Sequence, residues 1–148
     1  MDLFSKIITD LSLLIDYPII PDPKQLYGLE INHTLHLQLK EENNKVCIST
    51  FLGELTPGVG RDQLLKWALR ENQLRSETGV LCYTPRNNQL AFFLVVELET
   101  LSGVLLADIL EAFLQKALLW KKAIDTNENP LETSFTSKEA PSIFDLHP

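Results

Sequence analysis

The sequence predicts an α+β domain in which helices pack on one antiparallel sheet. Three observations carry this prediction. Residues 2–16, 61–74 and 102–124 repeat apolar residues at helical spacing. Residues 33–40 and 45–52 alternate apolar with polar residues, as half-buried strands do. Residues 89–98 are apolar on both faces of a strand. The expected order is helix, three strands, helix, two strands, helix.

Composition and charge limit the possible function. A chain of 148 residues has the size of one domain, and 45% hydrophobic with 22% charged residues is typical of a globular protein. The net charge of −7 disfavours binding to nucleic acid and to anionic membranes. No stretch has the length of a membrane span, and the N-terminus lacks a signal-peptide pattern. We therefore expect a cytosolic protein without membrane insertion.

The first helix is predicted from Asp2 to Asp16, with Asp2 as its cap and Pro18 after its end. Its apolar stripe comprises Phe4, Ile7, Ile8, Leu11, Leu14 and Ile15. A proline-rich connector leads to a short strand at 26–31. The strands at 33–40 and 45–52 form a hairpin around the polar turn 41–44, with Leu35, Leu37 and Leu39 on one face.

The second helix, at 61–74, has a broad apolar surface. Leu64, Leu65 and Ala68 form one face, whereas Trp67 and Leu74 lie well to its side. A helix that is apolar around more than half its girth has more than one surface to pack against. This breadth is a first indication of a subunit interface.

The hairpin at 79–98 gives a second indication. Its second arm places Leu90, Phe92 and Leu94 on one face and Phe93 and Val95 on the other. A strand of this kind is covered on both faces. The second cover is either a subunit or bound partner, or else a further helix of the same chain.

The third helix, 102–124, begins at the predicted cap Ser102. We expect residues 1–124 to form the domain and residues 125–148 a flexible acidic tail. This tail carries five acidic residues against one lysine, a net −4 of the chain's −7. Its apolar cluster from Ile143 to Leu146 leaves docking on the domain as the alternative.

Motifs for catalysis or metal binding are missing from the sequence. His33 and His36 are three apart on a predicted strand and so point to opposite faces. Cys47 and Cys82 lack CxxC spacing and are interpreted as free, buried thiols. The glycines between 53 and 60 lack both phosphate-loop spacings and are interpreted as a turn. We expect no catalytic residues, no metal and no cofactor, and therefore a protein that binds other proteins.

Five features, taken together, resemble the class I type III secretion chaperones, which hold effectors for export from bacteria. The resemblance covers residues 2–124, and the acidic tail departs from it. The features are the amphipathic helix before Pro18, the turn LGELTP at 52–57, the helix QLLKWALREN at 63–72, the strand region NNQLAFFLVVEL at 87–98, and the run FLQKALLW at 113–120.

The resemblance implies a cytoplasmic, non-enzymatic homodimer in a bacterium that binds the N-terminal segment of secreted effectors in extended form. It also makes the secretion ATPase a possible further partner. The implied effector groove comprises Phe4, Ile7, Ile8, Leu11, Leu35, Leu37, Val46 and Ile48. The implied dimer interface comprises Leu64, Leu65, Trp67, Ala68, Leu69, Phe93 and Val95. Two alternatives stay open: the groove residues form only the monomer core, or the chain is a general protein-interaction adaptor with no secretion role.

Overall fold

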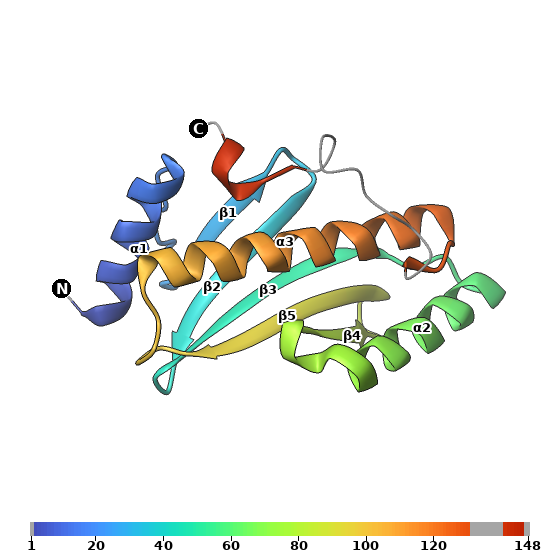
Figure 1. Ribbon diagram of the computed structural model, residues 1–148. Helices are drawn as coiled ribbons and strands as arrows, with labels where there is room; N and C mark the ends of the chain where they lie inside the picture. Colours follow the sequence, from blue (N-terminus) through green and yellow to red (C-terminus); the bar gives the residue numbers. More distant parts are fainter. Residues whose placement is uncertain (1, 131–140, 147–148) are drawn as a thin grey trace.

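A computed structural model describes residues 2–130 and 141–146. Five antiparallel strands form one sheet in the order β1-β2-β3-β5-β4. Figure 1 shows α3 running across one face of this sheet, with α1 packed near its start and α2 next to β4. The predicted fold class and order of elements are confirmed. We call the face that packs against α3 the inner sheet face and the opposite one the outer sheet face.

Helix α1 spans Leu3–Ile15. The Asp2 carboxylate accepts a hydrogen bond from the amide of Ser5 at 2.7 Å, which confirms the predicted cap. The helix ends at Asp16, whose φ of 52° is left-handed. Its predicted apolar stripe is buried except for Leu14, which is 48% exposed, and Phe4 meets Tyr27 of β1 edge to face.

Strands β1 (Tyr27–Ile31), β2 (Leu35–Glu42) and β3 (Lys45–Glu54) form the first part of the sheet. Strand β2 runs to Glu42 because the turn to β3 needs just Asn43 and Asn44, which both adopt positive φ. His33 was predicted to lie on a strand. It lies in the turn before β2 instead, where its φ of 60° is incompatible with a strand.

Helix α2 spans Val59–Arg75 and is followed by a single 3-10 turn, η1, at Ser76–Thr78. Strands β4 (Val80–Thr84) and β5 (Gln89–Glu97) then form the second hairpin, and β5 pairs with β3 as well. Gly79 has a φ of 129°, and a Cβ there would lie 2.4 Å from the ring of Phe92. The residue before β4 therefore has to be glycine for two independent reasons.

Helix α3 spans Gly103–Thr126, and the Ser102 hydroxyl caps it by accepting a hydrogen bond from the amide of Leu105 at 3.1 Å. Its apolar stripe fills the core above the sheet. Phe113 stacks on Phe92 of β5 with ring centroids 4.4 Å apart, and Trp120 is buried near the far end. The inner face of β5 is thus covered by the chain's own third helix.

Residues 141–146 dock on the helices, and Ile143–Asp145 form the 3-10 turn η3. Ile143 and Leu146 are buried in the common core. This matches the docking alternative for the apolar cluster at 143–146. Residues 131–140 and 147–148 of the predicted tail lie outside the described residues, and the division of the chain after residue 124 stays a prediction.

Candidate protein-binding surfaces

The outer sheet face carries an apolar area centred on β5. Its cross-strand pairs bring Phe93 beside Val80 and Ser49, and Val95 beside Cys47. Val95 is 48% exposed and Phe51 of β3 is 55% exposed, whereas Leu90 and Phe92 on the inner face of β5 are fully buried. Strand β5 is therefore enclosed by its own chain on one face and accessible on the other. An exposed apolar area on a sheet is a candidate contact surface.

Helix α2 has the same asymmetry. Leu64 and Ala68 pack into the core, whereas Leu65 and Trp67 are half-buried and Leu69 is 70% exposed. These accessible residues show that α2 has more apolar surface than residues 2–130 and 141–146 cover.

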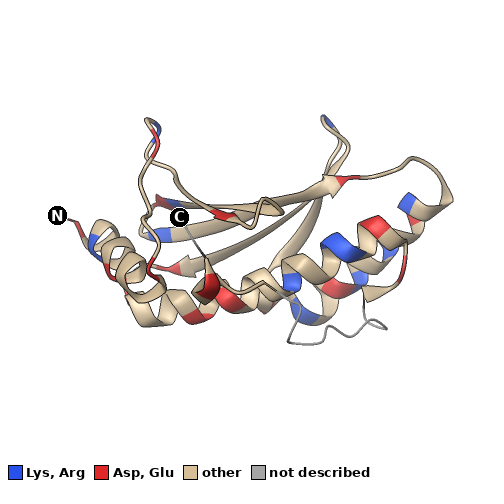
Figure 2. Ribbon diagram, turned by 90° about the horizontal axis from the view of Figure 1, so that it is seen from above, with Lys and Arg blue, Asp and Glu red and all other residues tan. Residues whose placement is uncertain are grey.

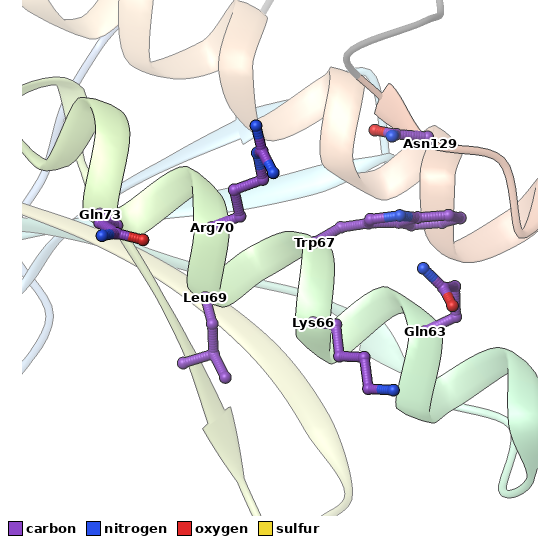
Figure 3. Close-up of a pocket in the computed structure, with 7 residues that line it drawn as sticks. All are labelled: Gln63, Lys66, Trp67, Leu69, Arg70, Gln73 and Asn129. Carbon is purple, nitrogen blue, oxygen red and sulfur yellow. The ribbon is translucent and has the colours of Figure 1, made fainter.

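A shallow pocket lies against α2. Figure 3 shows Trp67 reaching from the helix toward Asn129, while Leu69 points to the other side. The pocket is lined by Gln63, Lys66, Trp67, Leu69, Arg70, Gln73 and Asn129. We call the surface formed by these seven residues the α2 outer face. It mixes aliphatic, aromatic and polar side chains, a composition suited to contact with another protein.

Asn72 fixes α2 against the exposed edge of β4. Its side-chain amide donates a hydrogen bond to the carbonyl of Leu81 at 2.7 Å and accepts one from the amide of Leu81 at 2.8 Å. The two bonds reproduce the pairing that a neighbouring strand would make. They close this sheet edge at Leu81 to any added strand. Asn72 is the last residue of the run QLLKWALREN, and the sequence pattern did not predict this role for it.

A buried ionic cluster holds the same C-terminal end of α2. Glu71 is 3% exposed and pairs with Arg75 at 2.7 Å and with Lys116 of α3 at 2.8 Å. Burial alone would raise the pKa of Glu71. Hydrogen bonds from Arg75 and Lys116, together with their positive charges, outweigh burial and hold this pKa below its ordinary value.

Lys116 extends this cluster to the turn before β4. It donates to the hydroxyl of Thr78 at 2.7 Å and to the carbonyl of Gly79 at 3.3 Å. Its ammonium group also lies 5.4 Å from the ring centroid of Phe92. Helix α2 is therefore joined to α3 by the Glu71–Lys116 ion pair and to β4 by the hydrogen bonds of Asn72. In Figure 2 the charged residues of this region lie along α2 and the second half of α3.

All eight residues of the predicted effector groove lie in the core, each no more than 6% exposed. The structure brings together the members on α1 and on the inner sheet face. Their contact with an effector stays a prediction. On α1 and at the start of α3, apolar residues that reach the surface are Leu3, Leu13, Leu14, Val104 and Leu105.

Two small pockets flank these residues. One lies where α1 and α3 meet and is lined by Leu13, Leu14 and Val104, among others. The close approach of the two helices there requires Gly103, because a Cβ would lie 2.6 Å from that of Asp10. The other pocket lies at the start of β1, beside Ile20, Asp22, Leu26, Tyr27, Gly28, His36 and Gln38.

The chemistry of the described residues favours binding surfaces. Across 2–130 and 141–146, His, Cys, Asp and Glu form no group of three or more that would hold a metal ion. Cys47 and Cys82 are free but half-buried, less covered than predicted, because both lie on the outer sheet face. Burial raises the pKa of the Cys47 thiol, which lowers its reactivity. In this part of the chain, no helix has the length and apolar character needed to cross a membrane.

Comparison with known proteins relates this fold to other chains. A chain of the HopA1–SchA chaperone–effector complex superposes with a TM-score of 0.67 at 18% identity, covering 82% of this chain and 94% of that one. The Yersinia pestis type III secretion chaperone SycH, solved with a fragment of YscM2, gives 0.63 at 18% identity, with 78% and 97% covered. The ExsC–ExsE complex gives 0.65 at 16%, with 84% and 97% covered. These likenesses establish the fold.

A search of curated proteins finds no significant match. The model of the Tir chaperone protein (CesT) family matches residues 6–121, which is most of the described chain. The resemblance seen in the sequence is thereby confirmed. The chain belongs to the Tir chaperone protein (CesT) family.

Proposed function

We propose that this protein is a type III secretion chaperone of the bacterial cytoplasm. It binds the N-terminal segment of secreted effectors in extended form and keeps them soluble and competent for export, without catalysing a reaction. The observation that carries this proposal is the family match over residues 6–121. Structures of the same fold, solved as the HopA1–SchA chaperone–effector complex and as SycH with its YscM2 fragment, support it.

The protein acts as a homodimer in this proposal. The α2 outer face and the outer sheet face each expose apolar residues that a second copy would cover. Among the seven predicted interface residues, Leu65, Trp67, Leu69, Phe93 and Val95 reach the surface, whereas Leu64 and Ala68 support α2 from within. Covering such residues is the usual source of stability in an obligate dimer.

The effector segment binds at the opposite end of the sheet. Strand β1 is the second sheet edge and is bridged by Pro21 at Tyr27, whereas β4 is closed at Leu81 by Asn72. An extended segment that adds to β1 gains backbone hydrogen bonds, and its apolar side chains reach pockets beside it. Ile20, which is 74% exposed, lies at such a pocket. Contact with the secretion ATPase stays a prediction.

Oligomeric state tests the first part of this proposal. Light scattering on the purified chain at micromolar concentration is expected to give twice the monomer mass. Leu69→Asp is expected to give a monomer with unchanged thermal stability of the subunit, because the side chain is 70% exposed. The matched control is Leu13→Asp on α1, with a side chain 77% exposed, which should leave the dimer intact. A wild-type monomer would refute the dimer.

Client identity tests the second part. The chain is tagged, expressed in its native bacterium and purified, and the bound proteins are identified by mass spectrometry. We expect a protein that the bacterium secretes, held through its N-terminal segment. Truncation of that segment should abolish co-purification. Recovery of resident cytoplasmic proteins alone, in repeated preparations, would refute the chaperone function.

A further inference from the structure

Residues 141–146 occupy a surface formed by α1 and α3. Figure 1 shows this segment, in red, seated beside both helices. Ile143 is fully buried and Leu146 is 5% exposed, while Phe144 between them is 49% exposed. Leu146 directly follows the 3-10 turn and, like Ile143 at its start, is buried against the helices. The surface therefore receives two aliphatic side chains at positions i and i+3 and leaves the intervening aromatic one outside.

Two side chains of α3 bind the backbone of this segment. The Glu111 carboxylate accepts a hydrogen bond from the amide of Ile143 at 3.0 Å. Gln115, one turn later, donates to the carbonyl of Pro141 at 2.8 Å and to Glu111 at 2.9 Å. Every peptide offers such a carbonyl, and every residue except proline offers such an amide. Through these two bonds, Glu111 and Gln115 form a clamp on the backbone of the segment.

Ser142 adds one element of sequence preference. Its hydroxyl donates to Glu111 at 2.9 Å and accepts from the amide of Phe144 at 3.2 Å. A small hydroxyl residue is suited to this position, because it caps the turn and satisfies the carboxylate at once. The surface consequently selects a hydroxyl residue followed by aliphatic residues one and four positions later.

Two buried residues anchor this segment, whereas α1 buries five and α3 buries ten. One 3-10 turn with two anchoring side chains is not stable by itself. The segment is kept in place by its covalent link through residues 131–140, which gives it a high effective concentration. A separate peptide with the same pattern and more anchors would compete with it. The segment is therefore suited to be a replaceable occupant.

We propose that the surface of α1 and α3 beneath residues 141–146 is a binding site for a client segment with the pattern hydroxyl-aliphatic-x-x-aliphatic. Residues 141–146 hold this site in cis, and a client binds by displacing them. The identification of the displacing partner as a client rests on the chaperone function proposed above. This arrangement keeps the apolar surface of α1 and α3 covered in the absence of a client. A client occupies the site only if it binds tightly enough to displace residues 141–146.

Anisotropy of a fluorescein-labelled peptide tests the site. The peptide has the sequence of residues 139–148, EAPSIFDLHP. It should bind the full-length Ile143→Asp, Leu146→Asp double variant at least about tenfold more tightly than the wild type. If the chain's own segment occupies the wild-type site ~90% of the time, the apparent affinity of the wild type for the peptide is lowered about tenfold. Phe144→Asp is the matched control and should bind like the wild type. Equal affinity of the double variant and the wild type would refute the proposal.

Hydrogen exchange provides a test without a variant. Saturating unlabelled peptide, added to the wild-type chain, should remove exchange protection from the chain's own Ile143 amide and leave the amides in the middle of α3 protected. Protection at Ile143 that persists under saturating peptide would overturn displacement. A peptide carrying Ile143→Asp is the control and should change nothing.

Client capture separates this inference from the proposed function. The secreted protein identified with the wild type is titrated against the wild type and the double variant. Tighter binding by the double variant supports both ideas. Equal binding to both refutes the cis occupancy and leaves the chaperone function standing. If no secreted protein is found although the peptide displaces the segment, the chaperone function fails and the peptide site stands.

Discussion

Replacing Asn72 by alanine tests how α2 is fixed to the sheet. The substitution removes both hydrogen bonds to the backbone of Leu81, at 2.7 and 2.8 Å, and leaves that amide and carbonyl without their partner at a half-buried edge. Each lost bond costs about 1 kcal/mol, with more where the remaining group is shielded from water. Alanine recovers about 0.6 kcal/mol through its higher helix propensity. We expect a net loss of about 1–2 kcal/mol in the free energy of unfolding.

Urea unfolding followed by tryptophan fluorescence measures this loss, at one fixed protein concentration because a dimer's stability depends on it. The control is Gln73→Ala, which lies next along the same helix with an exposed side chain and should change stability by less than about 0.5 kcal/mol. Hydrogen exchange of the Leu81 amide gives a local readout and should speed up in Asn72→Ala alone. If both variants have the stability of the wild type and Leu81 stays protected, Asn72 does not hold the edge.

Two further predictions concern the core beneath α2. Glu71→Gln should destabilise the protein by about 3 kcal/mol at neutral pH, because it leaves the largely buried ammonium of Lys116 without its counter-charge. Since the pKa of Glu71 is lowered on folding, its contribution is present above the ordinary value of 4.5 and is lost as pH falls below it. Urea midpoints of variant and wild type should therefore converge on acidification, and a constant gap would contradict the pairing. Gly79→Ala should cost about 2 kcal/mol more than Gly58→Ala: both residues have φ above 120°, but only at Gly79 would a Cβ strike Phe92. Equal shifts in the thermal unfolding midpoint of the two variants would show that the Phe92 ring can move aside without loss of stability, which would contradict this prediction.

Much of the fold could be predicted because local signals agree with it. Asp2 and Ser102 act as the caps that their positions indicated, since a side chain oxygen next to unpaired amides needs no distant partner. The hairpin turn at Asn43 and Asn44 is likewise local. The prediction was wrong at His33, which lies in the turn between β1 and β2. The position of that turn is set by the register of β1 with β2, and this register is not visible in the local residue pattern.

The candidate surfaces were predictable in part. The breadth of α2 and the two-sided β5 indicated surplus apolar surface, and Leu69 and Val95 are indeed exposed. The pattern did not distinguish Leu64 from Leu69, because the direction in which a helix faces its sheet depends on packing. The clamp of Glu111 and Gln115 was missed for a similar reason: its partners lie about 30 residues later in the chain.

The sequence by itself determined the elements, their order, and the presence of more apolar surface than one helix or strand needs, because these properties depend on spacing along the chain. The tertiary structure decided which apolar residues are enclosed. It buried Phe4 and Leu37 and left Leu69 and Phe51 at the surface. It also seated Ile143 in the core. The reason is physical: whether a side chain is buried depends on how helices and strands that are far apart in the sequence pack together. The residues of one helix or strand do not determine that packing.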